Sequence, residues 1–276
     1  MEDTIRPLLG GKAAAIMGIV NTTPDTFSDG GRFLNIEDAY THAMTLVDQG
    51  ADILDIGGES TRPGAQPVGL QEELDRVLPV IERLANATDV PLSIDTYKPQ
   101  VMLAAVKAGA SMINDINGLR AEGALEAAAT VKVPICLMHM QGEPKDMQAA
   151  PDYQDVIKQV SIFFRERLDQ CIKHGIAKRD VILDPGIGFG KTLQHNLALL
   201  NNIESLNSMF GCEMLIGVSR KSLIDQLFGR SVEQRLPASL GLAVQAVLNG
   251  VKIARVHDVR STVDAIRAVE AVVHCA

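Results

Sequence analysis

One segment of the sequence is unusually rich in groups that could bind a ligand. Residues 55–65 (DIGGESTRPGA) follow the mainly apolar residues 51–54, and they combine two glycines with a serine, a threonine, an arginine and a proline. A connection between two elements needs only a turn, and polar residues that cap a strand explain one or two such positions. A dense set of hydrogen-bond donors after a buried strand predicts a binding surface.

The same pattern recurs after other apolar runs of the chain. Eight short runs rich in Ile, Val and Leu cover residues 15–20, 52–56, 91–94, 111–116, 134–138, 181–183, 214–218 and 252–256. The polar groups at or just after them are Asn21, Thr61 with Arg62, Asp95, Asn114 with Asp115, His139, Asp184, residues 219–221, and Arg255 with His257. Any one of these is explained equally well as a strand cap, but eight of them at one end of a sheet predict a site.

These polar residues fall into two chemical groups. Carboxylate and amide groups come from Asp95, Asn114 and Asp184, and a carboxylate can accept two parallel N–H groups from the edge of an amino-pyrimidinone ring. Cationic donors come from Arg62, Arg220, Lys221, Arg255 and His257, and they suit phosphate or carboxylate groups. Gly57 and Gly58 would let the backbone approach a ligand closely. We therefore expect a pocket with an acidic floor and a basic rim.

The elements that must position these groups alternate along the chain. The apolar runs are continuous, as in parallel strands that are buried on both faces. Helical spacing of apolar residues occupies residues 36–47, 156–172, 238–247 and 263–273. Eight such repeats predict an α/β protein with a single (β/α)8 barrel over residues 1–276, and a doubly wound open sheet is the alternative.

Three connections are long enough to be functional. They are residues 22–34, 57–69 and 141–152, after the first, second and fifth strands. In a barrel of this type, the active site lies at the carboxyl ends of the strands. The long connections are therefore expected beside the polar residues.

Composition excludes several classes of protein. The formal charge is −8, which argues against nucleic acid as the main partner. No stretch approaches the ~20 apolar residues of a membrane span, and the first residues lack the pattern of a secretory signal. We expect a cytoplasmic protein with no membrane partner. The four cysteines are far apart, which indicates reduced thiols.

Two cofactor motifs are only apparent. Residues 184–192 (DPGIGFGKT) end like a phosphate-binding P-loop, but Pro185 stands where that motif needs glycine, so the glycines are expected to shape a turn that brings Phe189 over the pocket. His139 and His257 lack the spacing of zinc ligands. Magnesium bound through a phosphate stays open, because that ion often takes only one or two protein ligands.

The sequence resembles the dihydropteroate synthase family in seven segments. They are residues 17–31 (MGIVNTTPDTFSDGG), 55–65, 93–96 (SIDT), 113–118 (INDING), 184–191, 217–222 (GVSRKS) and 255–259 (RVHDV). They span the chain in the order of the family. Thr26 is a mild departure, because many members have serine at that position.

The resemblance implies a reaction and roles for these residues. A 6-hydroxymethyl-7,8-dihydropterin diphosphate would condense with 4-aminobenzoate to give dihydropteroate and diphosphate. The pterin would lie against Asp95, Asn114, Asp184 and Lys221, with the Arg255 guanidinium stacked on it, and Gly217 and Arg62 would belong to the substrate-binding set. The diphosphate would be held by Asn21, Thr61, Arg255 and His257, with Mg2+ reached through Asn21. Aminobenzoate would lie between Phe27, Pro63 and Phe189, with Ser222 on its carboxylate.

The family also implies a mechanism. The C–O bond to diphosphate would break first, so that Asp95 stabilises a pterin cation while Lys221, Arg255 and His257 complete the catalytic set. Residues 22–34 and 57–69 would close over the site to exclude water. A pterin-dependent methyltransferase and a catalytically silent pterin-binding partner protein are the alternatives. The resemblance favours a homodimer.

Overall fold

Eight short parallel strands close into a barrel. The computed structural model describes residues 5–23, 31–273 and Cys275. The strands are β1 (Ala15–Asn21), β2 (Ile53–Gly57), β3 (Leu92–Asp95), β4 (Met112–Asp115), β5 (Ile135–Met138), β6 (Val181–Asp184), β7 (Glu213–Ile216) and β8 (Ile253–Val256). Each strand pairs with the next one in the sequence, and β1 also pairs with β8, with Ala15 opposite Ile253. The predicted barrel is confirmed, and each strand begins and ends within two residues of the predicted run.

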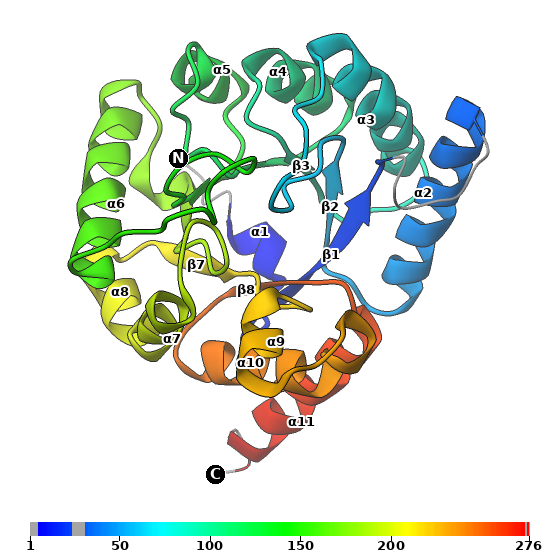
Figure 1. Ribbon diagram of the computed structural model, residues 1–276. Helices are drawn as coiled ribbons and strands as arrows, with labels where there is room; N and C mark the ends of the chain where they lie inside the picture. Colours follow the sequence, from blue (N-terminus) through cyan, green and yellow to red (C-terminus); the bar gives the residue numbers. More distant parts are fainter. Residues whose placement is uncertain (1–4, 24–30, 274, 276) are drawn as a thin grey trace.

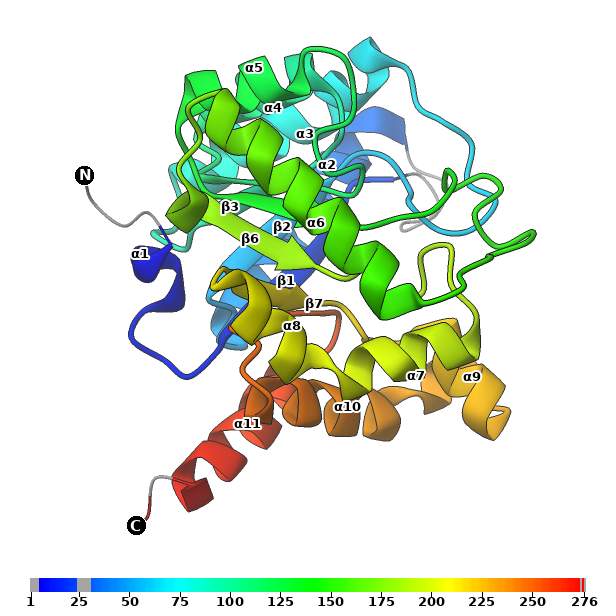
Figure 2. The ribbon, with the colours of Figure 1, turned by 90° about the vertical axis from the view of Figure 1, so that its left-hand side faces the viewer.

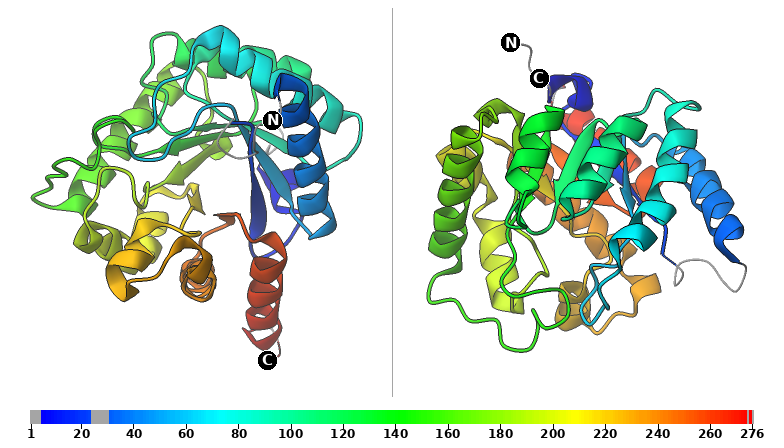
Figure 3. Two further views of the ribbon diagram at one scale, coloured as in Figure 1. Left: turned by 45° about the vertical axis from the view of Figure 1, so that its right-hand side comes forward. Right: turned by 90° about the horizontal axis from the view of Figure 1, so that it is seen from above.

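Helices enclose the strands, as Figures 1 and 3 show. They are α1 (Arg6–Leu9), α2 (Gly31–Asp48), α3 (Leu70–Ala85), α4 (Pro99–Ala108), α5 (Ala124–Val131), α6 (Val156–Lys173), α7 (Leu193–Asn201), α8 (Ile203–Phe210), α9 (Ser222–Phe228), α10 (Leu236–Leu248) and α11 (Val259–Val273). Two 3-10 turns, Lys178–Asp180 and Val232–Gln234, complete the described set. Their apolar faces pack on the outward side chains of the strands, such as Ile56 and Ile94, to form the main core. Gly50, which follows α2, has a φ of +95°, as expected for a residue that ends a helix.

The interior of the barrel is filled in layers. Alternate residues of a strand point inward, and the lower layer is apolar: Ala15, Met17, Ile53, Met112, Cys136, Ile182, Leu215 and Ile253. Ile5, just before α1, and Leu8, within it, pack against this layer, so that α1 closes one end of the barrel. Figure 2 shows α1 at one end and the long loops at the other. We therefore expect ligands to approach from the loop end.

Two connections are long, as predicted. Residues 58–69 join β2 to α3, and residues 139–155 join β5 to α6. Helix α2 begins at Gly31, inside the loop that was predicted to run to residue 34. The prediction placed the start of the helix too late because the apolar periodicity that marks it begins only at Ile36. Cys136, Cys171 and Cys212 are buried thiols, and Cys275 is an exposed one. Within the described ranges, no helix is long and apolar enough to span a bilayer.

Candidate active site

Polar side chains form the next layer of the barrel, directly above the apolar one. Each comes two residues after an inward-facing residue of its strand, which is Ser93 in β3 and a member of the apolar layer in the other strands. They are Asp55, Asp95, Asn114, Asp184 and Arg255, and Gly217 holds the equivalent position at the end of β7. Four of the five are buried, and Arg255 keeps 20% of its side chain exposed. The predicted acidic floor is thus assembled from five strands.

Arg255 is the centre of this layer. Its Nε donates to Asp55 Oδ2 at 2.6 Å, and its Nη2 donates to Asp95 Oδ2 at 2.7 Å. Asn114 Nδ2 donates to the same oxygen of Asp55 at 3.0 Å. Despite burial, the two carboxylates raise the pKa of Arg255, so that the guanidinium stays charged. Arg255, predicted to hold diphosphate and stack on the pterin, thus also links two carboxylates of the floor.

Several acceptors in the floor have no hydrogen-bond partner among the described residues. They are Asp55 Oδ1, Ser93 Oγ and Asp95 Oδ1. A buried polar atom without a partner costs about 1–3 kcal/mol, so such atoms mark a place where a ligand can supply donors. Burial raises the pKa of Asp95 to about 7, while Arg255 opposes the shift. An unpartnered carboxylate oxygen beside a charged guanidinium suits a donor-rich, flat heterocycle.

Asp184 and Lys221 face each other on the opposite side of the mouth. Asp184 Oδ1 accepts from the backbone N–H of Gly186 at 2.7 Å, and burial raises its pKa. Burial lowers the pKa of Lys221 to about 8, although Asp184 counteracts this. The Lys221 ammonium donates to the carbonyl of Ile187 and lies 4.6 Å from the centre of the Phe189 ring. The structure therefore brings Asp184, Lys221 and Phe189 together, as predicted.

Gly217 keeps the mouth open. A Cβ at this position would lie 3.7 Å from Lys221 Nζ and 3.9 Å from Arg255 Cβ. A larger side chain would fill the space between these two cations. Gly58 has a different role from the predicted close approach to a ligand, because a Cβ there would meet Val77 of α3 at 2.8 Å. It is the packing of α3 that requires a glycine at this position.

The rim is formed by the loops after β7 and β8. Ser219 Oγ lies 3.1 Å from Nδ1 of His257 and accepts from the His257 backbone N–H at 3.2 Å. Burial and the nearby Arg255, Arg220 and Arg62 lower the pKa of His257 to about 4. The ring is therefore neutral at neutral pH, and the cations predicted for the rim do gather around it.

Arg220, predicted as a cationic donor for phosphate or carboxylate groups, is paired with a carboxylate of the protein itself. Its Nε donates to Asp258 Oδ2 at 2.9 Å, and its Nη2 forms an ion pair with the same carboxylate. Its backbone has a φ of +58°, which is uncommon for a residue with a side chain. The pair ties the loop after β7 to the loop after β8. Sequence spacing could not show it, because the partners are 38 residues apart.

The remaining predicted residues occupy the edge of the mouth. Asn21 ends β1 opposite Gly57 of β2. Thr61 is half-buried, Arg62 and Pro63 are exposed on the loop after β2, and Ser222 is exposed at the start of α9. Phe27 lies outside the described residues. These positions leave the aminobenzoate pocket a prediction.

Lys191 has a structural role. Its side chain is 2% exposed, and its Nζ lies 3.0 Å from His139 Nδ1 while donating to the carbonyls of His139, Gly186 and Phe189 at 2.9–3.2 Å. Every donor of the ammonium is used to hold the turn after β6. This turn cannot present Lys191 to a phosphate, in agreement with the rejected P-loop. His139 is likewise committed to the turn.

Asp55 and Ser93 are site residues that sequence reasoning missed. Asp55 is fully buried and organises both Asn114 and Arg255, although it was read only as the first residue of the donor-rich segment. The alternation within β2 could have placed it, because Asp55 follows the inward Ile53 by two residues. Asp115, by contrast, points away from the interior and accepts from the backbone N–H groups of Asn117 and Leu119 at 2.7 Å.

The fold and the polar layer together define a pterin-binding barrel enzyme. The sequence profile described as "Pterin binding enzyme" matches residues 17–257. The chain is 51% identical to the dihydropteroate synthase of Escherichia coli K12 over 256 residues, which cover 93% of this chain and 90% of that protein.

Solved structures agree with this class. A structure of Xanthomonas albilineans dihydropteroate synthase with 4-aminobenzoic acid is 50% identical, with a TM-score of 0.90 and coverage of 95% of this chain and 93% of that one. Another, in complex with 7,8-dihydropteroate, is 46% identical, with a TM-score of 0.86 and coverage of 95% and 94%. The chain belongs to the dihydropteroate synthase family.

Proposed function

We propose that this site performs dihydropteroate synthesis by a dissociative substitution. The reaction of the family joins 6-hydroxymethyl-7,8-dihydropterin diphosphate to 4-aminobenzoate and releases diphosphate. In the proposed order, the C–O bond breaks first, and its electron pair leaves with diphosphate. The arylamine nitrogen then forms the C–N bond and loses a proton to the released diphosphate or to water. The observation that carries the proposal is the unpartnered Oδ1 of Asp95, buried beside a charged guanidinium.

The floor of the barrel suits the pterin. Asp184 and Asp95 supply acceptors for the ring N–H groups, and the amide of Asn114 is held in orientation by Asp55. Asp95 would then lie beside the positive charge that develops as diphosphate leaves. An arylamine is already nucleophilic, so the site needs to stabilise charge rather than to supply a strong base.

The rim suits the leaving diphosphate. Arg255 and Arg62 both lie close enough to His257 to lower the pKa of its ring. A bound anion would favour the protonated form of His257, which is neutral in the empty site. Thr61 can add a hydroxyl donor. We expect these groups to stabilise the charge that accumulates on the departing oxygen.

A magnesium ion fits this arrangement. Within residues 5–23 and 31–273 and at Cys275, no cluster of three or more His, Cys, Asp or Glu side chains could hold a metal ion by itself. Mg2+ is often held by one or two protein oxygens together with substrate phosphates. The amide oxygen of Asn21, at the end of β1, can be such a ligand. When bound, the ion would neutralise charge on the diphosphate.

The aminobenzoate pocket is proposed at the edge of the mouth. Phe189 supplies an apolar face already packed against Met138 and Met140. Pro63 would supply the other wall, with the Ser222 hydroxyl on the carboxylate. Phe27 would complete the pocket. The loop that contains Pro63 must settle before this pocket is complete.

Two measurements test the proposed chemistry. Release of diphosphate from the pterin diphosphate, with and without 4-aminobenzoate, separates a synthase from a pterin-binding protein that does no chemistry. Labelling the bridging oxygen with 18O then tests the order. If the C–O bond breaks first, the label should scramble in recovered substrate when the amine is absent. A label that never moves, in enzyme that is active with the amine, would favour direct displacement.

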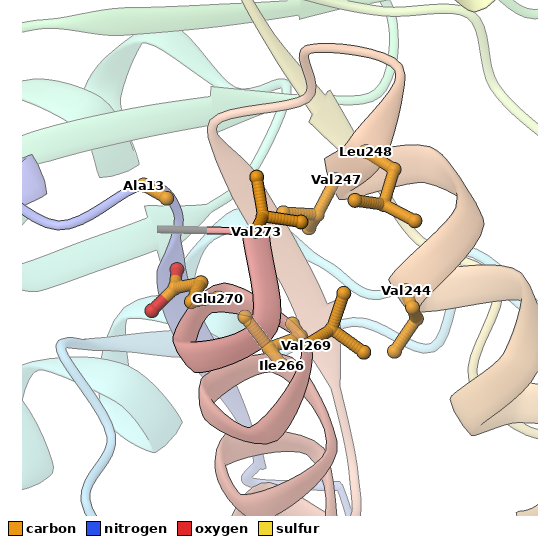
Figure 4. Close-up of a pocket in the computed structure, with 8 residues that line it drawn as sticks. All are labelled: Ala13, Val244, Val247, Leu248, Ile266, Val269, Glu270 and Val273. Carbon is orange, nitrogen blue, oxygen red and sulfur yellow. The ribbon is translucent and has the colours of Figure 1, made fainter. Parts of the chain in front are cut away.

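We also propose that the chain forms a homodimer through α10 and α11. An apolar groove lies between these helices, lined by Ala13, Val244, Val247, Leu248, Ile266, Val269, Glu270 and Val273 (Figure 4). Leu248 and Val273 are more than half exposed. Glu270 Oε1 is buried without a partner among the described residues. A second copy would cover the apolar groups and could supply a donor to Glu270.

Light scattering over a dilution series tests this proposal. We expect a dimer that the substitution Leu248→Glu converts to a monomer, because a charge would enter an apolar contact. A monomer at every concentration would rule the dimer out.

A further inference from the structure

The loop between β2 and α3 has two parts that differ in how they are held. We call residues 57–59 and Val68 the neck, and residues 60–67 the tip. The neck packs on α3, where Arg76 Nη1 donates to the carbonyl of Gly58 at 2.7 Å. It also touches the start of the first loop, where Thr22 N donates to the carbonyl of Gly57 at 2.9 Å.

Three charged side chains meet beneath the neck. Lys98, just before α4, forms ion pairs with both Glu59 of the neck and Glu73 of α3. The side chains of Lys98, Glu59 and Glu73 are only 15%, 10% and 1% exposed. We call these three residues the clamp. Although burial opposes it, the two carboxylates raise the pKa of Lys98, so the ammonium stays charged.

Neighbouring groups complete the clamp. Thr96 Oγ1 donates to Glu73 Oε1 at 2.6 Å, and Tyr97 Oη donates to Glu59 Oε1 at 3.1 Å. The backbone N–H of Val68 donates to Glu59 Oε2 at 3.3 Å. Glu59, on the segment that enters the loop, therefore binds Val68, on the segment that leaves it, and this contact holds the two sides of the neck together.

The tip is held much more weakly. Arg62, Pro63 and Gly64 are exposed. The one backbone hydrogen bond shown between the tip and another described loop is from Gly64 N to the carbonyl of Pro144, at 3.1 Å. A segment with few buried contacts opens at low free-energy cost. The tip can therefore move while the neck stays in place.

The composition of the clamp indicates a task beyond stability. Two carboxylates share one ammonium, so three buried charged groups carry a net charge of −1. Buried ion pairs gain little net stability over apolar side chains of similar size, because desolvation offsets the attraction. An apolar contact would hold α3 and α4 together equally well. It would not hold Val68 and Lys98 to one carboxylate with defined geometry.

We propose that Glu59, Glu73 and Lys98 are positioning residues that restrict loop closure to the tip. With the neck fixed, closure carries Thr61, Arg62 and Pro63 along one path to the mouth. The inference rests on the proposed function, in which these residues complete the diphosphate and aminobenzoate sites. The clamp residues are not among the groups proposed to bind either substrate. Without the clamp, the neck moves with the tip, and the closed arrangement becomes one of many.

The test compares two outcomes of the same reaction. A closed tip excludes water, so the ratio of hydrolysed pterin diphosphate to dihydropteroate reports how well the loop closes. We expect Lys98→Met to raise this ratio and the KM for 4-aminobenzoate by ~10-fold or more, as for other misplaced groups remote from the chemistry. The KM for pterin diphosphate should change less than twofold, because the floor is unaltered. Amide exchange should lose protection at Val68.

Control variants separate positioning from general damage. Glu37→Gln breaks the exposed ion pair between Glu37 of α2 and Arg83 of α3. It should leave the hydrolysis ratio and the KM for 4-aminobenzoate unchanged. Lys98→Arg keeps the charge, so its hydrolysis ratio and its KM for 4-aminobenzoate should stay close to those of the unmodified enzyme. If Lys98→Met does not fold, Tyr97→Phe removes only the contacts of the Tyr97 hydroxyl with the Glu59 carboxylate and should raise the hydrolysis ratio to a smaller extent.

The outcomes that would overturn the inference are distinct from a failure of the proposed function. Absence of synthase activity in the unmodified enzyme would remove the function itself. If folded Lys98→Met keeps its synthase activity and its hydrolysis ratio equals that of the unmodified enzyme, the proposed role of the clamp is rejected and the proposed function is not. Equal losses for both substrates would show that the three residues only support the barrel.

Discussion

Arg255 and Asp95 are hydrogen-bonded partners at 2.7 Å across the mouth of the barrel. The cation proposed for the leaving diphosphate is therefore in contact with the carboxylate proposed for the pterin cation. In the proposed reaction, the C–O bond of the pterin diphosphate would break in the space that these groups border. Separation of charge in the substrate is matched by a charge separation that is already built into the site, which is the arrangement that favours a dissociative step.

Asp184→Asn tests the pterin floor. The substitution keeps the size of the side chain but replaces an acceptor oxygen with a donor that opposes an N–H group of the ring. Affinity for the pterin should fall about tenfold or more. Calorimetry on folded protein measures it, and unchanged affinity would show that Asp184 serves only the turn at Gly186.

Arg255→Ala tests the double role of the guanidinium. Pterin diphosphate should lose more affinity than the pterin alcohol, since only the former has the anion. Removal of the cation also leaves Asp55 and Asp95 without their partner, and we expect the free energy of unfolding to fall by ~3 kcal/mol. Equal losses for the two ligands would leave only a role in the floor.

The pH dependence of catalysis should follow Asp95 and Lys221. Asp95 can stabilise a cation only when ionised, and burial raises its pKa to about 7. The value of kcat/KM for pterin diphosphate should therefore rise as pH increases to about 7. It should fall above about 8, where Lys221 loses its proton. Asp95→Asn should remove the acid limb, after correction for the ionisation of the substrate.

The raised pKa of Asp95 makes stability and activity change in opposite directions with pH: as pH rises, kcat/KM increases and the free energy of unfolding decreases. A carboxyl group whose pKa is higher in the folded state than its ordinary 3.8 binds its proton more tightly in the native protein. Its contribution to the free energy of unfolding is present at low pH and is lost as pH rises through about 7. A smaller loss over this range in Asp95→Asn would confirm the assignment.

The order of binding provides a further test. In the proposed site, the aminobenzoate pocket is complete only when the exposed tip of the second loop settles, so the free enzyme should bind 4-aminobenzoate poorly. Pterin, diphosphate and magnesium should strengthen its binding, with a coupling of about 1–3 kcal/mol. Pro63→Ser should weaken aminobenzoate and leave pterin binding nearly intact. Tight binding to ligand-free enzyme would indicate a preformed pocket.

Gly186→Ala tests the turn that Lys191 supports. The φ of Gly186 is +69°, and a Cβ would lie 1.9 Å from the carbonyl oxygen of His139. The substitution should lower the free energy of unfolding by more than about 1 kcal/mol. Gly175→Ala is the matched control, because it has a similar φ of +84° with no atom within 4 Å of the added Cβ. Similar losses in both would show that backbone strain alone is responsible.

Much of the architecture could be predicted, because buried parallel strands leave an unambiguous pattern of continuous apolar runs. The polar layer followed from it, since Asp95 and Asp184 end their strands and Asn114 is one residue before the end of its strand. The partners within the layer could not be predicted. Arg255 meets Asp55 from 200 residues away, and only the curvature of the closed barrel decides which carboxylates it reaches.

Residues with two plausible roles were also beyond the sequence. Lys191 looked like part of a phosphate loop or of a turn, and only the three carbonyls around its ammonium distinguish them. Arg220 looked like a phosphate ligand until its pairing with Asp258 was seen. In both cases a long cationic side chain could reach several partners, so the sequence could not predict which partner it binds.

Pairing of β1 with β8 also affects how the protein matures during synthesis. Asp55 and Asp95 belong to early strands, but the arginine that neutralises them arrives only with the last strand, 200 and 160 residues later. At about 5–20 residues per second, a ribosome leaves the edge of β1 unpaired for roughly 10 to 50 s. An unpaired strand edge is a template for aggregation, and the active site cannot be complete before β8 has been made.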